Sequence, residues 1–240
     1  MGSGADTPSP VSDWERQLKG QIQRRYATLK FPPDGAGRAI EAGYPAELIA
    51  KTPEWLAASY LGCGFLLGDL RLAGDEIVID LGCGTGLDSY LLAMELTNAG
   101  IVLAIDMTPK ILSQVQRISV GNIIPLAGDM ERLPLTDELA DMVIANASLN
   151  LTLDKGKALA EACRILKPGG RLLARDLVKV DELPPEVLSD PLSYNTSLGG
   201  ALAEEDLVSE IAKAGFKDIA IMDHQPFSYV QSVKIEAVAD

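Results

Sequence analysis

The sequence predicts an α/β fold in which a doubly wound, mostly parallel sheet of seven strands follows an N-terminal helical extension. From residue 76 onward, short apolar runs rich in β-branched residues alternate with segments of helical periodicity. Such alternation is typical of a parallel sheet whose strands are joined by crossover helices. A glycine-rich turn follows the first apolar run, and open α/β sheets bind ligands at this position. We therefore divide the chain into a disordered tail at 1–11, a helical extension at 12–75 and a core at 76–240.

Composition and charge restrict the class of partner. The chain has 240 residues, 47% of them hydrophobic and 23% charged, and a net charge of −13. This charge argues against a nucleic acid or an anionic membrane surface as partner, because both attract clustered Lys and Arg. The longest apolar stretch, Leu56 to Leu67, is too short to cross a bilayer, and no signal peptide is visible. Three cysteines without a framework spacing predict reduced thiols and a cytoplasmic protein.

The extension is expected to be helical throughout. Ser12 and Glu15 have the spacing of a capping box, and apolar residues then recur at helical spacing up to Leu29. The stretch 31–35 contains two prolines and a glycine, which should end this helix. Two shorter helices are expected near Pro45 and Pro53, because proline is favoured in the first turn.

The core shows seven strand-like runs, with helical segments between most of them. The strands are predicted at 76–81, 101–106, 122–127, 140–146, 171–177, 216–222 and 227–238, the last two as an antiparallel pair. Helices are predicted at 87–99, 108–119, 154–166 and 203–214. Gly100 ends the first, the stretch 167–170 ends the third and Gly215 ends the last. The connection 178–203 is long and rich in Pro and Gly, so we expect it to act as a substrate loop.

The glycine turn indicates which nucleotide binds. Asp80 ends the first strand, and Gly82, Gly84 and Gly86 follow at alternate positions. The dinucleotide fingerprint G-x-G-x-x-G requires a small residue at position 87, which is leucine. The observed spacing resembles class I S-adenosylmethionine (SAM) methyltransferases, which have a Rossmann-like fold. A tight turn in another α/β protein remains the alternative.

The resemblance implies a set of cofactor contacts at successive strand ends. Asp80 would hold the amino group of SAM, directly or through water, beside the three glycines. Asp106 ends the second strand and would bind the ribose hydroxyls. Met107 and Met130 would pack on the two faces of adenine, and Asp129 would accept its amino group. A helix cap for Asp106 and a loop acid for Asp129 are the structural alternatives.

Other polar residues are candidates for the acceptor side. They lie at the ends of strands four and five or beside the predicted pocket: Asn146, Asn150, Asp176, Tyr60 and Tyr194. Of these, Asn146 would also face the transferred methyl group, and Tyr60 and Tyr194 would pack on a substrate or orient its lone pair. His224 is the only histidine and is expected in a solvated turn between the last two strands. No metal site is expected.

Residues 40–220 resemble, more closely, the arsenite methyltransferase family. The resemblance rests on six stretches: Tyr60–Gly64, Asp80–Gly86, Ile105–Pro109, Asn146–Leu151, Leu166–Gly170 and Leu198–Ala201. The family binds trivalent arsenic through cysteine thiolates. Cys63 matches one of these positions, whereas Ala147 and Ser197 stand where the family has two further cysteines. Cys83 is expected to be packed in the turn, and Cys163 to lie in the core.

The resemblance therefore implies SAM as cofactor and a small-molecule acceptor other than arsenite. Three alternatives remain open. The first is arsenite methylation with Cys63 and a second thiol, from glutathione or from Cys163. The second is a SAM-binding protein without turnover. The third is an NAD-dependent oxidoreductase, against which Leu87 argues. The oligomeric state is not predicted.

Overall fold

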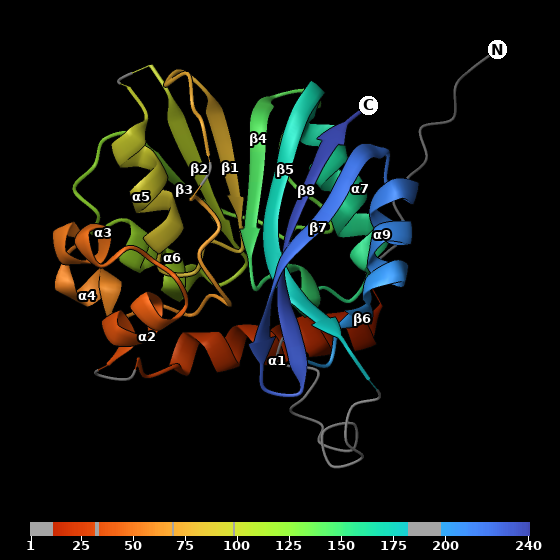
Figure 1. Cartoon of the computed structure of the whole chain (residues 1–240), viewed down its shortest axis with the longest axis horizontal. Coiled ribbons are helices and arrows are strands. Elements are labelled where there is room, and N and C mark those ends of the chain that lie inside the picture. The colour runs from red at the N-terminus through yellow and green to blue at the C-terminus, as the bar shows by residue number, and fades with distance from the viewer. Residues whose placement is uncertain (1–11, 32–33, 69, 98, 182–197) are drawn as a thin grey trace.

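The computed structural model describes residues 12–31, 34–68, 70–97, 99–181 and 198–240. Its centre is a sheet of eight strands in which seven follow the order β3-β2-β1-β4-β5-β8-β7 and a short β6 pairs with β5 (Figure 1). The strands are β1 (Ile77–Leu81), β2 (Ile101–Asp106), β3 (Ile123–Ala127), β4 (Ala140–Asn146), β5 (Leu166–Lys179), β6 (Leu202–Ala203), β7 (Phe216–Phe227) and β8 (Val230–Ala239). Strands β1 to β6 pair in parallel, and β8 is antiparallel to both of its neighbours. The predicted doubly wound, mostly parallel sheet is confirmed.

Helices cover both faces of the sheet with their apolar sides, which explains why β1 is apolar on both faces up to Asp80. Successive residues of a strand point to opposite faces. Val78 packs in a cluster with α5 (Leu87–Glu95), whereas Ile79 packs in a cluster with α7 (Lys155–Ile165) and α9 (Glu204–Lys213). Figure 1 shows α5 on one side of the sheet and α7 and α9 on the other.

The order of the strands reverses at β1. The chain passes from β1 to β2 and β3 on one side and then returns to place β4 on the other side of β1. The carboxyl ends of β1 and β4 therefore form a crevice, and ligands of doubly wound sheets bind at such a switch point.

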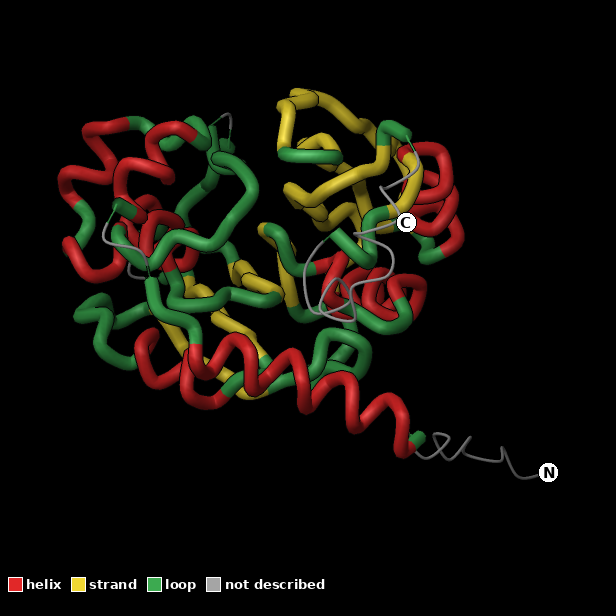
Figure 2. Tube along the Cα trace, turned by 90° about the horizontal axis from the view of Figure 1, so that it is seen from below, coloured by secondary structure: helices red, strands yellow, loops and turns green. Residues whose placement is uncertain are grey.

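The extension consists of four helices in the described residues. They are α1 (Asp13–Thr28), α2 (Gly35–Glu41), α3 (Ala46–Lys51) and α4 (Glu54–Ala57). Helix α1 begins with the predicted capping box, in which Glu15 N–H donates to Ser12 Oγ at 3.2 Å and Ser12 N–H donates to Glu15 Oε2 at 2.7 Å. It crosses below the carboxyl ends of the strands, the side seen in Figure 2.

Several boundaries differ from those predicted. Helix α2 was not expected. Its first residue is Gly35, where a Cβ would lie 1.9 Å from the carbonyl oxygen of Ala58, so no side chain fits there. Helix α5 ends at Glu95, so Gly100 does not end it. Strand β5 starts at Leu166, earlier than predicted, and passes through a register irregularity opposite β4.

Strand β7 continues to Phe227, so His224 lies within the strand rather than in a turn. Asp223 lies beside an irregularity of this strand and has a left-handed φ of 52°. It forms an ion pair with Arg175 of β5, whose side chain is 0% exposed. The same guanidinium donates to the carbonyl of Phe65 at 3.2 Å. The ion pair therefore joins the antiparallel strands to the segment that precedes β1.

Candidate functional site

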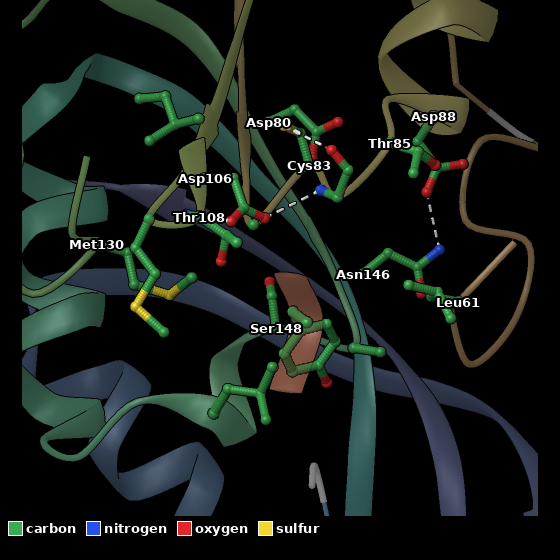
Figure 3. Close-up of a pocket in the computed structure, with 18 of the residues that line it drawn as sticks. Leu61, Asp80, Cys83, Thr85, Asp88, Asp106, Thr108, Met130, Asn146 and Ser148 are labelled. Carbon is green, nitrogen blue, oxygen red and sulfur yellow. Dashed lines mark hydrogen bonds between the residues drawn. The ribbon is translucent and has the colours of Figure 1, made fainter. Parts of the chain in front are cut away.

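A cavity lies at the switch point, between the carboxyl ends of β1 to β4 and helix α1 (Figure 3). The cavity and its open mouth together hold about 1060 Å³, a size that suits small-molecule ligands. The predicted cofactor residues Asp80, Gly82, Gly84, Asp106, Met107, Asp129 and Met130 all line it. Tyr60 and Asn146 line it as well, whereas Gly86 lies behind the turn at the start of α5.

The glycine turn adopts backbone conformations that residues with side chains rarely adopt. Gly82, Gly84 and Gly86 have φ values of 74°, 53° and 91°, in the left-handed region that favours glycine. A Cβ on Gly82 would also lie 2.4 Å from Cβ of Ser148. The N–H of Gly82 donates to the carbonyl of Ile105 at 2.8 Å, so the turn is fixed against the end of β2.

Asp80 is almost completely buried at the base of the cavity. Its side chain is 3% exposed, and Ser89 Oγ donates to Oδ2 at 2.5 Å. Burial, reinforced by the nearby carboxyl of Asp88, raises the pKa of Asp80 to about 8. A cationic ligand group would restore the charged form.

Asp106 joins the end of β2 to the glycine turn. Its Oδ1 accepts the N–H of Thr108 at 2.8 Å, and its Oδ2 accepts the N–H of Gly84 at 3.2 Å. Burial raises the pKa of this carboxyl, and the two N–H groups oppose that effect. Each carboxylate oxygen accepts more than one hydrogen bond, so both retain capacity for the two hydroxyls of a ribose.

Asp129 is fixed by groups that the sequence did not indicate. Its Oδ2 lies 2.6 Å from Nζ of Lys19, and its Oδ1 accepts the N–H of Glu131 at 3.0 Å. Lys19 also lies 2.8 Å from Oε2 of Glu131. On the next turn of α1, Gln23 Nε2 donates to the carbonyl of Met107 at 2.7 Å. Helix α1 is thereby attached to the loops after β2 and β3.

Three residues of α1 line the cavity: Lys19, Ile22 and Tyr26. The helical periodicity already placed Ile22 and Tyr26 on one face of this helix. No sequence signal indicated that the face lies over the cavity, because its contacts are to residues more than eighty positions away.

Asn146 is held in a dense hydrogen-bond network. Its Oδ1 accepts the N–H of Cys63 at 3.0 Å, while Nδ2 lies 2.9 Å from Oδ2 of Asp88 and 3.0 Å from the carbonyl of Gly64. Tyr44 donates its hydroxyl to Oδ1 of Asp88 at 2.7 Å. Figure 3 shows Asn146 and Asp88 joined at one side of the cavity. The amide therefore orders the segment before β1 at the cavity wall.

Tyr60 is 6% exposed, and its ring packs edge-on against Tyr44 with the centroids 5.2 Å apart. Within the described ranges, its buried hydroxyl has no hydrogen-bond partner, which is unusual for a polar group in this position. Tyr194, the other tyrosine candidate, and Ser197 lie outside the described residues.

Asn150 and Asp176 do not line this cavity. Asp176 Oδ2 accepts the N–H of Asn150 at 3.0 Å, and Asn150 Nδ2 donates to the carbonyl of Leu177 at 2.7 Å. Lys155 Nζ lies 2.5 Å from Oδ1 of Asn150, and burial lowers the pKa of this lysine to about 8. These residues join β5 to the start of α7.

The three cysteines differ in their surroundings. Cys63 is 4% exposed, packs against Leu177 and Val230, and its Sγ lies 3.3 Å from the carbonyl oxygen of Arg175. Burial raises the pKa of the Cys63 thiol. Cys83 lines the cavity within the glycine turn, and burial raises its pKa too. Cys163 is partly buried at the edge of the core rather than inside it.

His224 is exposed outside the cavity, with Nε2 2.6 Å from Oε2 of Glu204. Over the described part of the chain, no group of three or more His, Cys, Asp or Glu side chains is placed to hold a metal ion. Likewise, no described helix has the length and apolar character needed to cross a bilayer.

Comparisons with known proteins agree with this geometry. The family described as "Methyltransferase domain" matches residues 72–215. The chain is 34% identical to an arsenite methyltransferase of Halobacterium salinarum over 183 residues, which cover 75% of the chain and 46% of that protein. It is 31% identical to the human arsenite methyltransferase over 210 residues, covering 82% and 56%. The chain thus spans about half the length of these curated relatives.

Solved structures show the same fold. An arsenic(III) S-adenosylmethionine methyltransferase from Chlamydomonas reinhardtii superposes with a TM-score of 0.63 at 29% identity, covering 86% of this chain and 73% of that one. Phosphoethanolamine N-methyltransferase 2 of Haemonchus contortus, in complex with S-adenosyl-L-methionine, gives a TM-score of 0.69 at 14% identity, covering 91% and 60%. The latter likeness concerns the fold alone.

Proposed function

The chain belongs to the SAM-dependent methyltransferase family with the class I, Rossmann-like fold, and we propose that it transfers a methyl group from SAM to a small-molecule acceptor. The observation that supports this activity most directly is the convergence of Asp80, the glycine turn, Asp106 and Asp129 on one cavity at the switch point. These are the positions at which the cofactor contacts were expected.

We assign the polar end of the cofactor to β1 and its turn. The positive φ of Gly82 and Gly84 leaves room for the methionine moiety and the ribose beside the backbone. Asp80 would pair with the ammonium group of the cofactor, directly or through water. The attraction between the two charges would offset part of the free energy that burial of the carboxylate costs.

We assign the nucleoside to the ends of β2 and β3. Asp106 would accept hydrogen bonds from the two ribose hydroxyls, and Met107 and Met130 would contact the faces of adenine. Asp129 would accept the adenine amino group while Lys19 remains on its Oδ2. The 12–75 extension and the 178–203 loop would close over the acceptor.

Bound SAM supplies an electrophilic methyl group on a sulfonium centre. The residues of the chain then contribute mainly alignment and exclusion of water, which bring the acceptor into line with that methyl group. Tyr60 and the ordered Asn146 would shape the wall against which the acceptor rests. Tyr194 remains a proposed contact from the 178–203 loop.

We propose that the acceptor is not arsenite. Cys63 is buried against the carbonyl of Arg175 rather than lining the cavity, and Ala147 and Ser197 occupy the other two positions where the resemblance implies cysteines. Trivalent arsenic prefers soft thiolate ligands, and a buried thiol with a raised pKa is a poor one.

Arsenite methylation is the second candidate, because relatives at 31–34% identity carry that name. An arsenite titration followed by Trp55 and Trp14 fluorescence tests it, with Cys63→Ser as the matched variant. Micromolar arsenite binding that is lost in Cys63→Ser would favour this candidate. A SAM-binding protein without turnover is distinguished by tight SAM binding with no acceptor able to enter the cavity.

Calorimetry with SAM and its demethylated product tests the main proposal. We expect binding of both to the wild-type chain. Asp106→Ala should weaken both by about 2–3 kcal/mol, because hydrogen bonds to a charged group are lost. Absence of binding of either compound at millimolar concentration would refute the assignment, and unchanged affinity of Asp106→Ala would refute the role of Asp106.

A further inference from the structure

The charges around the cavity restrict the class of acceptor. Five acidic side chains line it: Asp80, Asp88, Asp106, Asp129 and Glu131. Among the described lining residues, Lys19 is the one basic side chain, and its ammonium lies within 2.8 Å of both Asp129 and Glu131. Its charge is therefore already neutralised by two carboxylates.

Three basic side chains near this site do not line the cavity, and the first of them, Arg38, donates to the carbonyl of Tyr60 at 2.9 Å. Arg175 is buried in its ion pair with Asp223, and Lys155 points its ammonium at the Leu149 carbonyl and at Asn150, away from the cavity lining. The residues outside the described ranges include no Lys, Arg or His. Whatever their placement, their side chains can add only negative charge.

The wall opposite Met130 is the part left for the acceptor once the proposed cofactor contacts are assigned. Figure 3 shows Leu61, Asn146 and Asp88 on this side, with Asp106 between them and Met130. Tyr44 and Tyr60 stand behind it as a buried aromatic pair. The wall thus combines Leu61 and the two aromatic rings with polar uncharged groups and one carboxyl, and it has no basic side chain among its described residues.

The carboxyls beside this wall are held by hydrogen bonds. Asp88 accepts hydrogen bonds from Tyr44 and Asn146, and Asp106 accepts two backbone N–H groups. The single histidine of the chain, His224, is exposed outside the cavity. The cavity therefore offers no histidine base, and an acceptor that must lose a proton before it attacks would depend on one of these carboxyls.

Resting on the proposed methyl transfer, we propose that the acceptor is a small molecule that is uncharged at neutral pH and attacks with its own lone pair, and that anionic acceptors are excluded. A thioether sulfur and a pyridine-type nitrogen share this chemistry. An anion would be buried beside carboxylates without a counter-charge, which is strongly unfavourable.

The charge movement in the reaction agrees with this choice. The acceptor lone pair forms a bond to the methyl carbon while the carbon–sulfur bond breaks, and its electron pair stays on sulfur as a neutral thioether. The positive charge thereby moves from the cofactor to the methylated acceptor. Asp88 lies on the side that receives this charge, and carboxyl groups stabilise cations.

Matched probes test the inference in the complex with S-adenosylhomocysteine, where no turnover occurs. The probes are methyl phenyl sulfide against 4-(methylsulfanyl)benzoate, and quinoline against quinoline-6-carboxylate, titrated by calorimetry at pH 7.5. We expect each neutral probe to bind at least tenfold more tightly than its carboxylate. Equal or tighter binding of the carboxylates would overturn the inference, as would failure of all four probes to bind.

A variant that adds a positive charge to the acceptor wall provides a second test of the inference. Leu61→Lys adds a cation to the acceptor wall and should lower the preference for the neutral probe by about tenfold, whereas Leu61→Met should leave it unchanged. A preference that stays the same in Leu61→Lys would contradict the electrostatic explanation. Binding of S-adenosylhomocysteine is measured for each variant, so loss of the cofactor site is distinguished from a wrong acceptor class.

Discussion

The ammonium nitrogen of Lys19 lies 2.6 Å from a carboxylate oxygen of Asp129, although the two residues are 110 positions apart in the chain. The lysine side chain is only 18% exposed there. The contact attaches helix α1 to the loop that we propose to bind adenine. Helix α1 is therefore a wall of the proposed cofactor site as well as part of the extension.

Replacement of Lys19 by Met should speed the release of S-adenosylhomocysteine by about three- to tenfold. The substitution removes two partly buried ion pairs that hold α1 over the cavity, and a pair of this kind is worth ~1 kcal/mol. Stopped-flow tryptophan fluorescence would measure the release rate. Lys19→Arg, which retains the charge, should lie closer to wild type.

Lys157→Met is the matched control for this prediction. Lys157 also pairs with an aspartate, Asp154, but its side chain is 61% exposed and does not line the cavity. We expect its release rate to equal that of wild type. An unchanged rate in Lys19→Met would show that α1 does not retain the cofactor.

Asn146 should act mainly through structure. Asn146→Asp places a second carboxylate where Nδ2 now lies 2.9 Å from Oδ2 of Asp88. We expect a loss of about 3 kcal/mol in the free energy of unfolding, because buried hydrogen bonds are lost and charges repel. The loss should be larger at pH 8 than at pH 5, because burial raises the pKa of Asp88 and a second carboxyl beside it raises both further, so the folded state loses stability as pH rises. Urea unfolding at the two pH values measures it.

Asn122→Asp is a suitable comparison, because Asn122 Nδ2 donates to the carbonyl of Ala93 at 3.2 Å and lies outside the cavity lining. A loss of about 1 kcal/mol is expected there. If Asn146→Asp folded with wild-type stability but lost activity, Asn146 would instead act on the substrate.

The parts of the molecule that were predictable are those with local signals. Strand β1 is a continuous apolar run, and the glycines after it have positive φ values that other residues rarely adopt. Both features depend on a few neighbouring residues. The ends of β2 and β3 follow from the same pattern, which is why Asp106 and Asp129 were placed at the cavity.

The parts that were missed depend on distant contacts. Lys19 has no local pattern that distinguishes it from other helix-surface lysines, and only the packing of α1 under the sheet brings it to Asp129. Helix α2 was missed because the prolines at 32–33 favour a chain break, while the helix that starts after them depends on contact with Ala58. Strand β5 gains its first residues from pairing with β4.

Cys63 should resist alkylation in the folded protein. The thiolate is the reactive form of cysteine, and burial raises the pKa of the Cys63 thiol and closes it to reagent. After N-ethylmaleimide treatment at pH 8, peptide mass spectrometry should find Cys163 modified first. In urea, all three cysteines should react. Rapid labelling of Cys63 in the native state would reopen its role as a substrate ligand.

Asp80 should couple cofactor binding to pH. Its pKa is raised to about 8 in the folded chain, chiefly by burial, so the carboxyl is mostly protonated at pH 7. If it pairs with the ammonium group of SAM, binding at pH 7 should release close to one proton, and affinity should rise with pH up to about 8. Calorimetry at pH 7 in two buffers of different ionisation enthalpy measures the proton count.

The same raised pKa has an opposite consequence for stability. Between the unfolded-state pKa near 4 and the folded-state value of about 8, the folded chain holds a proton that the unfolded chain has lost. The Asp80 contribution to the free energy of unfolding therefore falls as pH rises through this window. Asp80→Asn should flatten that decline and abolish the proton release, whereas Asp218→Asn, at an exposed position, should change neither. Undiminished proton release by Asp80→Asn would assign the titrating group to another carboxyl of the cavity.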